Sequence, residues 1–229
     1  MRILIVSGAG GGSSKKSIGK YFHLKDFGDA LKKHDVEYKL ISELDYFIGF
    51  PTKSLRKFFS SKKKLDELIS EFKPDAVLVD RQGSFGLEII KRNIPLFVLL
   101  RGHYWSEIEY AKNTIYKGMV MRKIVDIRAK VAEKVFAGST EILPICKYLK
   151  DIVKEYYPTQ KSSIFIEGVD DEKWYQTNDM ELKHPCVGML QDANWWRKTK
   201  EMLTLEKVIE TMPDTHFYWA GDGQYKDKI

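Results

Sequence analysis

Short apolar runs alternate with longer amphipathic segments along most of the chain. The first run, Arg2–Ser7, is rich in β-branched residues and contains no turn residue, and an amphipathic segment over 18–34 follows it. A continuous apolar run of this length predicts a buried strand of a parallel sheet, and apolar residues three and four positions apart predict a helix.

The same two patterns recur as far as residue 166. They predict further strands over 36–41, 76–80, 95–100, 134–137 and 163–166. They predict further helices over 62–72, 84–92, 107–133 and 141–156, with an irregular stretch over 45–61 and Ser139 or Thr140 as the cap of the last helix. The repeated order of strand and helix predicts an α/β fold with a doubly wound, mostly parallel, Rossmann-like sheet.

The pattern changes at residues 175–184, which are polar and have no apolar period. We therefore predict an N-terminal domain over 1–175 and a linker over 176–184. The rest, 185–229, predicts two strands (185–190 and 216–220) around a helix (195–210), with a turn at 221–223. Two strands and a helix cannot enclose a core, so we expect 185–229 to be the start of an incomplete second Rossmann-like domain, and the chain to be a fragment.

Composition narrows the class of protein. The chain has 229 residues and a net charge of +6, and no apolar run approaches the roughly 20 residues that span a membrane. Met1 leads directly into the first strand, so we expect no signal peptide. Cys146 and Cys186 form no C-x-x-C, which favours reduced thiols and a cytoplasmic location. No D-x-D or H-E-x-x-H motif is present, so we expect no metal and no cofactor.

Four glycines directly after the first strand form a candidate ligand loop. Strand, glycine loop and helix in this order make an anion-binding crevice at the carboxyl edge of α/β sheets. The spacing matches neither G-x-G-x-x-G nor a P-loop, and a flexible loop is an equally good interpretation. The candidate binding residues here are Gly8, Gly10, Gly11, Gly12 and Ser13.

Polar residues also follow two later strands at the same predicted edge. Asp80 ends one strand, and Arg101 and His103 follow another. His103 is positioned to donate a hydrogen bond to a substrate hydroxyl or diphosphate, although a loop histidine bonded to backbone is the commoner case. Asp80 and its neighbours line the crevice or cap the helix that begins at Ser84.

Residues 47–64 carry six cations and no acid, with four phenylalanines among them. This composition suits an anionic membrane surface, and a solvated basic face over core phenylalanines is equally compatible with it. Nucleic acid fits less well, and we expect no nucleic-acid partner. The predicted membrane-contact residues are Lys53, Arg56, Lys57, Lys62, Lys63 and Lys64. A second basic stretch, over 112–130, is diluted by Asp126 and is equally compatible with an ordinary helix.

Several segments, taken in order, resemble glycosyltransferase family 4. Residues 2–12 are similar to its N-terminal strand and glycine-rich loop, and 134–149 (KVFAGSTEILPICKYL) to its strand–Ser–helix segment. Residues 165–170 (FIEGVD) resemble its P-N-G-V-D turn, and Trp174 stands where an aromatic residue usually follows. Residues 186–190 (CVGML) resemble its V-G-R-L strand, Arg197 and Lys198 stand at its (R)K-G position, and 221–223 (GDG) resemble its G-D-G turn.

The resemblance implies a GT-B fold, in which an acceptor-binding domain faces a domain that binds the nucleotide-sugar donor. It implies retaining transfer of a hexosyl-type sugar to a hydroxyl acceptor without a metal. His103 would correspond to the histidine near the transferred sugar, and Lys198 to the lysine on the donor diphosphate, where an ammonium stabilises charge on the leaving phosphate. The basic segment extends this expectation to a lipid-linked acceptor and a peripheral position on the inner face of the membrane.

The chain departs from the family pattern at three places. Met189 stands where the family has arginine, with Arg197 as a candidate replacement, and Glu167 stands where asparagine is usual. The E-x7-E motif of the donor site would lie past residue 229, so we expect the isolated chain to be inactive. A second hypothesis is therefore a non-catalytic carbohydrate- or partner-binding module.

Two further expectations follow from the sequence. An NAD-dependent oxidoreductase is a weaker hypothesis, because no acidic residue is expected at the end of the second strand, where a ribose would bind. We also expect two chains to pair through 185–229, whose apolar edges would otherwise be exposed.

Overall fold

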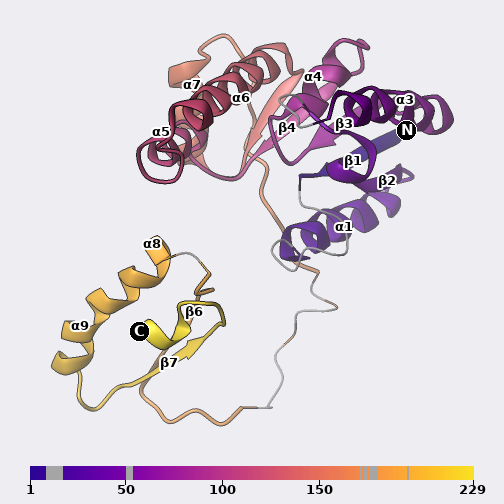
Figure 1. Ribbon diagram of the computed structural model, residues 1–229. Helices are drawn as coiled ribbons and strands as arrows, with labels where there is room; N and C mark the ends of the chain where they lie inside the picture. The colour runs from indigo at the N-terminus through magenta and orange to yellow at the C-terminus, as the bar shows by residue number, and fades with distance from the viewer. Residues whose placement is uncertain (9–17, 50–53, 171, 173–174, 176–179, 195) are drawn as a thin grey trace. The chain divides into compact units, whose positions relative to one another are not determined.

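The computed structural model describes residues 1–8, 18–49, 54–170, 172, 175, 180–194 and 196–229. The chain divides into two compact units, Met1–Asp171 and Glu172–Ile229 (Figure 1). Among the described residues, no helix combines the length and the hydropathy needed to cross a bilayer.

The first unit is built on a five-stranded parallel sheet with the strand order β2-β1-β3-β4-β5. Its strands are β1 (Arg2–Ser7), β2 (Glu37–Ser42), β3 (Ala76–Val79), β4 (Leu96–Leu100) and β5 (Glu141–Pro144). One row of paired residues crosses the whole sheet and contains Ile41, Val6, Val79, Val98 and Ile142. All five strands therefore end at a common carboxyl edge, as the predicted α/β fold requires.

Alternate residues of the strands pack against helices on the two faces of the sheet. Leu4 and Val6 face one side, where they meet α3 (Leu55–Phe72), α4 (Ser84–Ile90), α6 (Met119–Gly138) and α7 (Lys147–Tyr156). Ile5 faces the other side, where it packs with Leu24 of α1 (Ile18–Lys32) and with Phe165. Figure 1 shows α1 on the opposite face of the sheet from α3 and α4. The doubly wound, mostly parallel sheet is thereby confirmed.

Three predicted elements between residues 107 and 156 are wrong in part or in whole, although α7 confirms the predicted helix over 147–156. The predicted helix over 107–133 is two helices, α5 (Tyr104–Thr114) and α6, because Gly118 caps the second in extended backbone. The predicted strand over 134–137 continues α6, since Val135 and Phe136 reach the core from a helix. Residues 141–144 form β5 instead of a helix, and Ser139 is a C-cap, not an N-cap.

Two smaller corrections concern the segments beside this region. Residues 163–166 form no strand, although the backbone follows β5 through Ser163 N–H to Ile142 O (3.3 Å) and Phe165 N–H to Pro144 O (2.8 Å). The stretch predicted to be irregular contains α2 (Glu43–Tyr46) and the first turns of α3. The α3 helix begins early because the Ser54 hydroxyl accepts the backbone N–H of Lys57 at 3.3 Å.

The second unit contains two parallel strands, β6 (Cys186–Leu190) and β7 (His216–Ala220). The helical segment between them is α8 (Trp196–Thr199), a 3₁₀ stretch (Lys200–Leu205) and α9 (Glu206–Thr211). Of the described residues in this unit, only Ala193 and Thr199 are buried. Both predicted strands and the predicted helical region are present, but they enclose almost no core.

Candidate functional site

The sheet changes its winding direction between β1 and β3. The chain passes from β1 to β2 on one side, and from β3 through β4 to β5 on the other. At such a switch point the loops at the carboxyl edge diverge and leave a crevice in which α/β proteins bind ligands. Gly8 follows β1 at this point, and Asp80 and Arg81 follow β3.

Gly8 makes room for a neighbouring side chain. A Cβ atom at this position would lie 2.3 Å from Cδ of Arg81. The arginine stem therefore packs across the backbone at the end of β1, and glycine is required for that approach. The other candidate loop residues, Gly10, Gly11, Gly12 and Ser13, lie outside the described residues.

Two carboxyl groups lie at this edge. Asp80 is buried, and its Oδ2 has no hydrogen-bond partner among the described residues. The pKa of Glu43 is raised, mainly because the carboxyl group is buried and also because Asp80 lies nearby. The charge of Arg81 and a hydrogen bond from the Phe85 backbone N–H offset part of this rise. A buried acceptor without a donor is satisfied when a ligand hydroxyl or N–H reaches it.

The structure corrects one expectation about Glu43. The second strand was predicted to end at Ile41 without an acidic residue at its end, but β2 extends to Ser42 and Glu43 follows directly. Its carboxylate is used within the fold, where it accepts the Phe85 N–H. The sequence did contain a signal for this residue, because Glu43 comes directly after the strand that ends at Ser42.

Arg101 and His103 follow β4 at the same carboxyl edge. Arg101 forms an ion pair with Glu167 (Nη2 to Oε1, 2.6 Å), and its Nε is buried without a partner among the described residues. This pair joins the edge of the sheet to the 165–170 segment. Together with α1 it borders a cavity of about 310 Å³ whose polar lining includes His23, Asp26, Asp29, Lys33, Arg101 and Glu167.

His103 is the N-cap of α5. Its Nδ1 accepts the backbone N–H of Ser106 at 3.2 Å. A neutral imidazole that accepts at Nδ1 carries its proton on Nε2, so Nε2–H is left as a donor. The ring is half-buried between Trp105 (centroids 6.0 Å apart) and Tyr148 (6.1 Å). His103 thus combines a backbone contact at Nδ1 with a donor atom at Nε2, the two roles considered for it.

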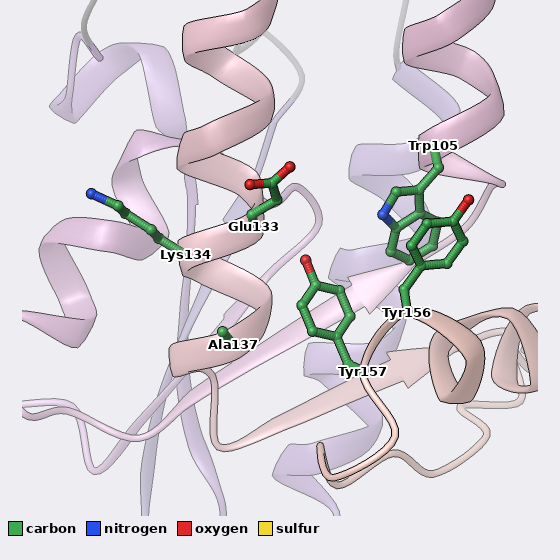
Figure 2. Close-up of a pocket in the computed structure, with 6 residues that line it drawn as sticks. All are labelled: Trp105, Glu133, Lys134, Ala137, Tyr156 and Tyr157. Carbon is green, nitrogen blue, oxygen red and sulfur yellow. The ribbon is translucent and has the colours of Figure 1, made fainter.

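An aromatic stack holds the start of α5, and sequence reasoning did not identify it. Trp105 stacks on Tyr156 with ring centroids 4.3 Å apart and planes 8° apart, and its ring also lies 5.4 Å from Phe136. A hollow of about 490 Å³ lies beside this stack and is lined also by Glu133, Lys134, Ala137 and Tyr157. Figure 2 shows these side chains around it. By fixing Trp105, the stack fixes the backbone that carries His103.

In the second unit, the loops after β6 and β7 pack tightly on one another. A Cβ at Gly221 would lie 1.9 Å from the backbone oxygen of Gln191, and Gly223 has a φ of 149°. The N–H of Ala193 donates to Asp222 O at 2.9 Å. The glycines of the G-D-G turn therefore allow the two loops to pack closely against each other.

Lys198 lies in α8, beyond the carboxyl end of β6, and is exposed. Arg197 lies in the same helix, and its side chain is outside the described part of the structure. Met189 lies within β6. The described residues of both units hold no group of three or more His, Cys, Asp or Glu side chains that could bind a metal ion.

Five of the six predicted membrane-contact cations lie on α3. Lys62 pairs with Glu88 (3.4 Å), Lys63 lies 3.9 Å from Glu67, and Lys64 donates to the backbone oxygen of Asp45. Arg56 and Lys57 are exposed, and Lys53 lies outside the described residues. Of the neighbouring aromatic residues, Phe47 is buried and Phe59 is 64% exposed.

Comparison with known proteins gave no match to a family model and none to a curated protein. Two solved structures are similar at low scores. The UGT73P12 structure of Glycyrrhiza uralensis, complexed with glycyrrhetinic acid 3-O-monoglucuronide, has a TM-score of 0.40 and 12% identity over 71% of this chain. UDP-N-acetylglucosamine 2-epimerase from Rickettsia bellii has a TM-score of 0.39 and 13% identity over all of it. The chain spans 42% and 63% of the lengths of these two proteins.

Proposed function

We propose that the chain is part of a glycosyltransferase of the GT-B type, which moves a sugar from a nucleotide-sugar to a hydroxyl acceptor. The first unit binds the acceptor and the second contributes to the donor site. The observation that carries this proposal is a set of polar atoms at one sheet edge. Buried Asp80 Oδ2 and buried Arg101 Nε have no hydrogen-bond partner among the described residues, and His103 accepts at Nδ1, so its Nε2–H is a donor.

These atoms suit the polar parts of a sugar acceptor and of a transferred sugar. Asp80 accepts a hydrogen bond from an acceptor hydroxyl, and the Nε2–H of His103 donates to a sugar or phosphate oxygen. On the donor side, Lys198 and Arg197 bear positive charge that stabilises the leaving diphosphate, so no metal is required for that task. Retention of configuration is part of the proposal through the sequence resemblance.

The proposal includes a lipid-linked acceptor and a peripheral membrane position, because the chain is basic and bears basic segments. It also includes pairing of two chains through 185–229, where apolar side chains such as Leu190 (89% exposed) lie at the surface. Sedimentation velocity of the chain and of Leu190→Ser measures this pairing, and an unchanged monomer in both samples contradicts it.

The main test uses the two roles of His103. His103→Asn keeps an N-cap acceptor for Ser106 N–H but removes the Nε2–H donor, whereas His103→Ala removes both. Binding of a glycoside panel and of UDP-, GDP- and ADP-sugars is followed by saturation-transfer NMR. We expect at least a tenfold loss of saccharide affinity in both variants and in Asp80→Asn, with the fold of His103→Asn retained.

The outcomes separate the candidate functions. Wild-type binding that survives in all three variants would place the saccharide elsewhere and overturn the proposal. Glycoside binding without any binding or turnover of nucleotide-sugars would favour the non-catalytic carbohydrate-binding module. Binding of both a glycoside and a nucleotide-sugar would favour the transferase, and nucleotide release that depends on both would contradict the expectation that the chain is inactive by itself.

A further inference from the structure

Residues 115–123, which comprise the connection after α5 and the start of α6, carry a group of exposed apolar side chains. We call this segment the α5–α6 turn. Ile115 is 56% exposed, Met119 76%, Val120 72% and Met121 40%. A Cβ at Gly118 would meet no described atom within 4 Å, so the space beside this glycine is open. Four large apolar side chains gathered within seven positions are more than the scattered exposure normal for a protein surface.

Positive charges accompany these apolar side chains. Lys117, Arg122 and Lys123 are exposed and have no carboxylate partner among the described residues. Residues 110–125 include no acid, and Asp126, which follows them, pairs with Lys112. The α5–α6 turn is therefore a cationic apolar surface whose charges are free to meet an external anion.

Helix stability does not account for this arrangement. The amino end of a helix favours acidic side chains, because the unsatisfied N–H groups and the helix dipole make it positive. The first turn of α6 has no acid and begins with three apolar residues, and Arg122 and Lys123 follow at once. These charges disfavour the local helix, so a role in stabilising α6 does not explain them.

We infer that the α5–α6 turn is a membrane-docking surface that inserts its apolar side chains into an anionic lipid bilayer. The apolar side chains enter the boundary between headgroups and acyl chains, while the flanking cations contact lipid phosphates. Long Lys and Arg side chains suit this position, because their stems are apolar and their charged ends stay in water.

A bilayer fits this surface better than an acidic protein does. Of the described residues, none in the turn lines either of the two hollows given above, so neither hollow extends to this surface as a groove for a peptide or helix. Flexible methionines and dispersed cations impose little geometry on a partner, which suits a fluid interface. The inference does not depend on sugar transfer, and it moves the expected membrane contact from α3 to the α5–α6 turn.

The test measures sedimentation of the full chain with sucrose-loaded vesicles of phosphatidylcholine alone or mixed equally with phosphatidylglycerol. We expect binding to the anionic vesicles and little to the neutral ones. Arg122→Glu/Lys123→Glu should weaken binding at least tenfold, since each cation near such a surface contributes a factor of about five. Met119→Ser/Val120→Ser should weaken it about as much without any change of charge.

Matched controls come from α3, which offers the competing surface. Arg56→Glu/Lys57→Glu makes the same change of charge, and Leu55→Ser/Phe59→Ser removes side chains that are 62% and 64% exposed. Both controls should bind within about twofold of wild type. Circular dichroism checks the fold of every variant, and amide hydrogen exchange should slow over 115–123 when anionic vesicles are added.

Three results would overturn the inference. The first is a wild-type chain that does not bind anionic vesicles, which would leave an acidic protein as the occupant of this surface. The second is loss of binding in the α3 variants alone. The third is an equal loss in both charge variants with none in Met119→Ser/Val120→Ser, which would indicate unspecific attraction by net charge. None of these results bears on the saccharide test of His103.

Discussion

The two units are built from the same succession of strand and helix, yet they differ sharply in what they bury. In the first unit, residues such as Phe85 and Phe136 are almost wholly removed from solvent. In the described part of the second unit, Leu203, Val208 and Ile209 are each more than 40% exposed. Burial grows with the number of strands that have neighbours on both sides, and a two-stranded sheet has none. A local pattern thus forms an element, but only the surrounding layers turn it into a core.

The largest expected effect contrasts the two units directly. Phe136→Ala should lower the free energy of unfolding by about 3–5 kcal/mol, because it leaves a cavity under the aromatic stack. Leu203→Ala in the second unit should cost less than about 1 kcal/mol, since its side chain is 45% exposed. Urea titration of both variants measures the difference, and similar losses in the two would show that the second unit has a core of its own.

A smaller effect is expected at Glu88, a buried carboxylate of the first unit that has no counterpart in the described part of the second. It accepts from Lys91 (2.8 Å) and Arg92 (3.0 Å) and pairs with Lys62, so it links α4 to α3. Glu88→Ala should lower the free energy of unfolding by about 2 kcal/mol. Glu67→Ala removes an exposed ion pair and should lower it by less than about 0.5 kcal/mol. Urea titration measures both losses of unfolding free energy, and equal losses would show that burial does not strengthen the ion pairs of Glu88.

The same residue predicts a dependence on pH. Burial opposes ionisation of Glu88, but hydrogen bonds from Lys91 and Arg92 outweigh it and hold its pKa below the ordinary value of 4.5. A lowered folded-state pKa adds stability above pH 4.5 that is lost as the pH falls through the lowered value. Wild-type protein should therefore lose more stability between pH 7 and pH 3 than Glu88→Gln, as followed by thermal unfolding at each pH.

The smallest effect concerns the surface of the first unit, where α1 meets β2. Hydrogen bonds from Lys25 and Tyr38 lower the pKa of Asp29 to about 2, and burial with the Asp29 hydrogen bond raises that of Tyr38 to about 12. Asp29→Asn should return the pKa of Tyr38 toward 10, which ultraviolet titration of the phenol measures. An unchanged pKa would mean that burial alone sets it.

The sequence predicted well those parts of the fold whose pattern is local. The strands over 2–7, 76–80 and 95–100 were correct to within a residue, because central parallel strands are continuous apolar runs. The boundary between α6 and β5 was wrong because 134–137 and 141–144 are both short and apolar. Only tertiary packing decides between helix and strand for such runs, and here Val135 and Phe136 reach the core from a helix.

The candidate site was predictable in location but not in contacts. That Asp80, Arg101 and His103 share an edge follows from parallel topology alone. The ion pair of Arg101 with Glu167, 66 positions away, and the stacking of Trp105 on Tyr156 depend on how distant segments pack. The hydrogen bond that orients His103 is local, and an N-cap signal three residues before Ser106 was visible in principle.

The two loops that follow β6 and β7 are joined to each other by backbone hydrogen bonds. The Ala193 amide is held by Asp222 O, and its carbonyl accepts the Tyr225 N–H at 3.1 Å. Because these hydrogen bonds join the two loops, we expect the loops to move together as one rigid unit. A ligand that binds at the start of α8 would therefore also restrain the turn after β7, although the two segments are some thirty positions apart in the chain.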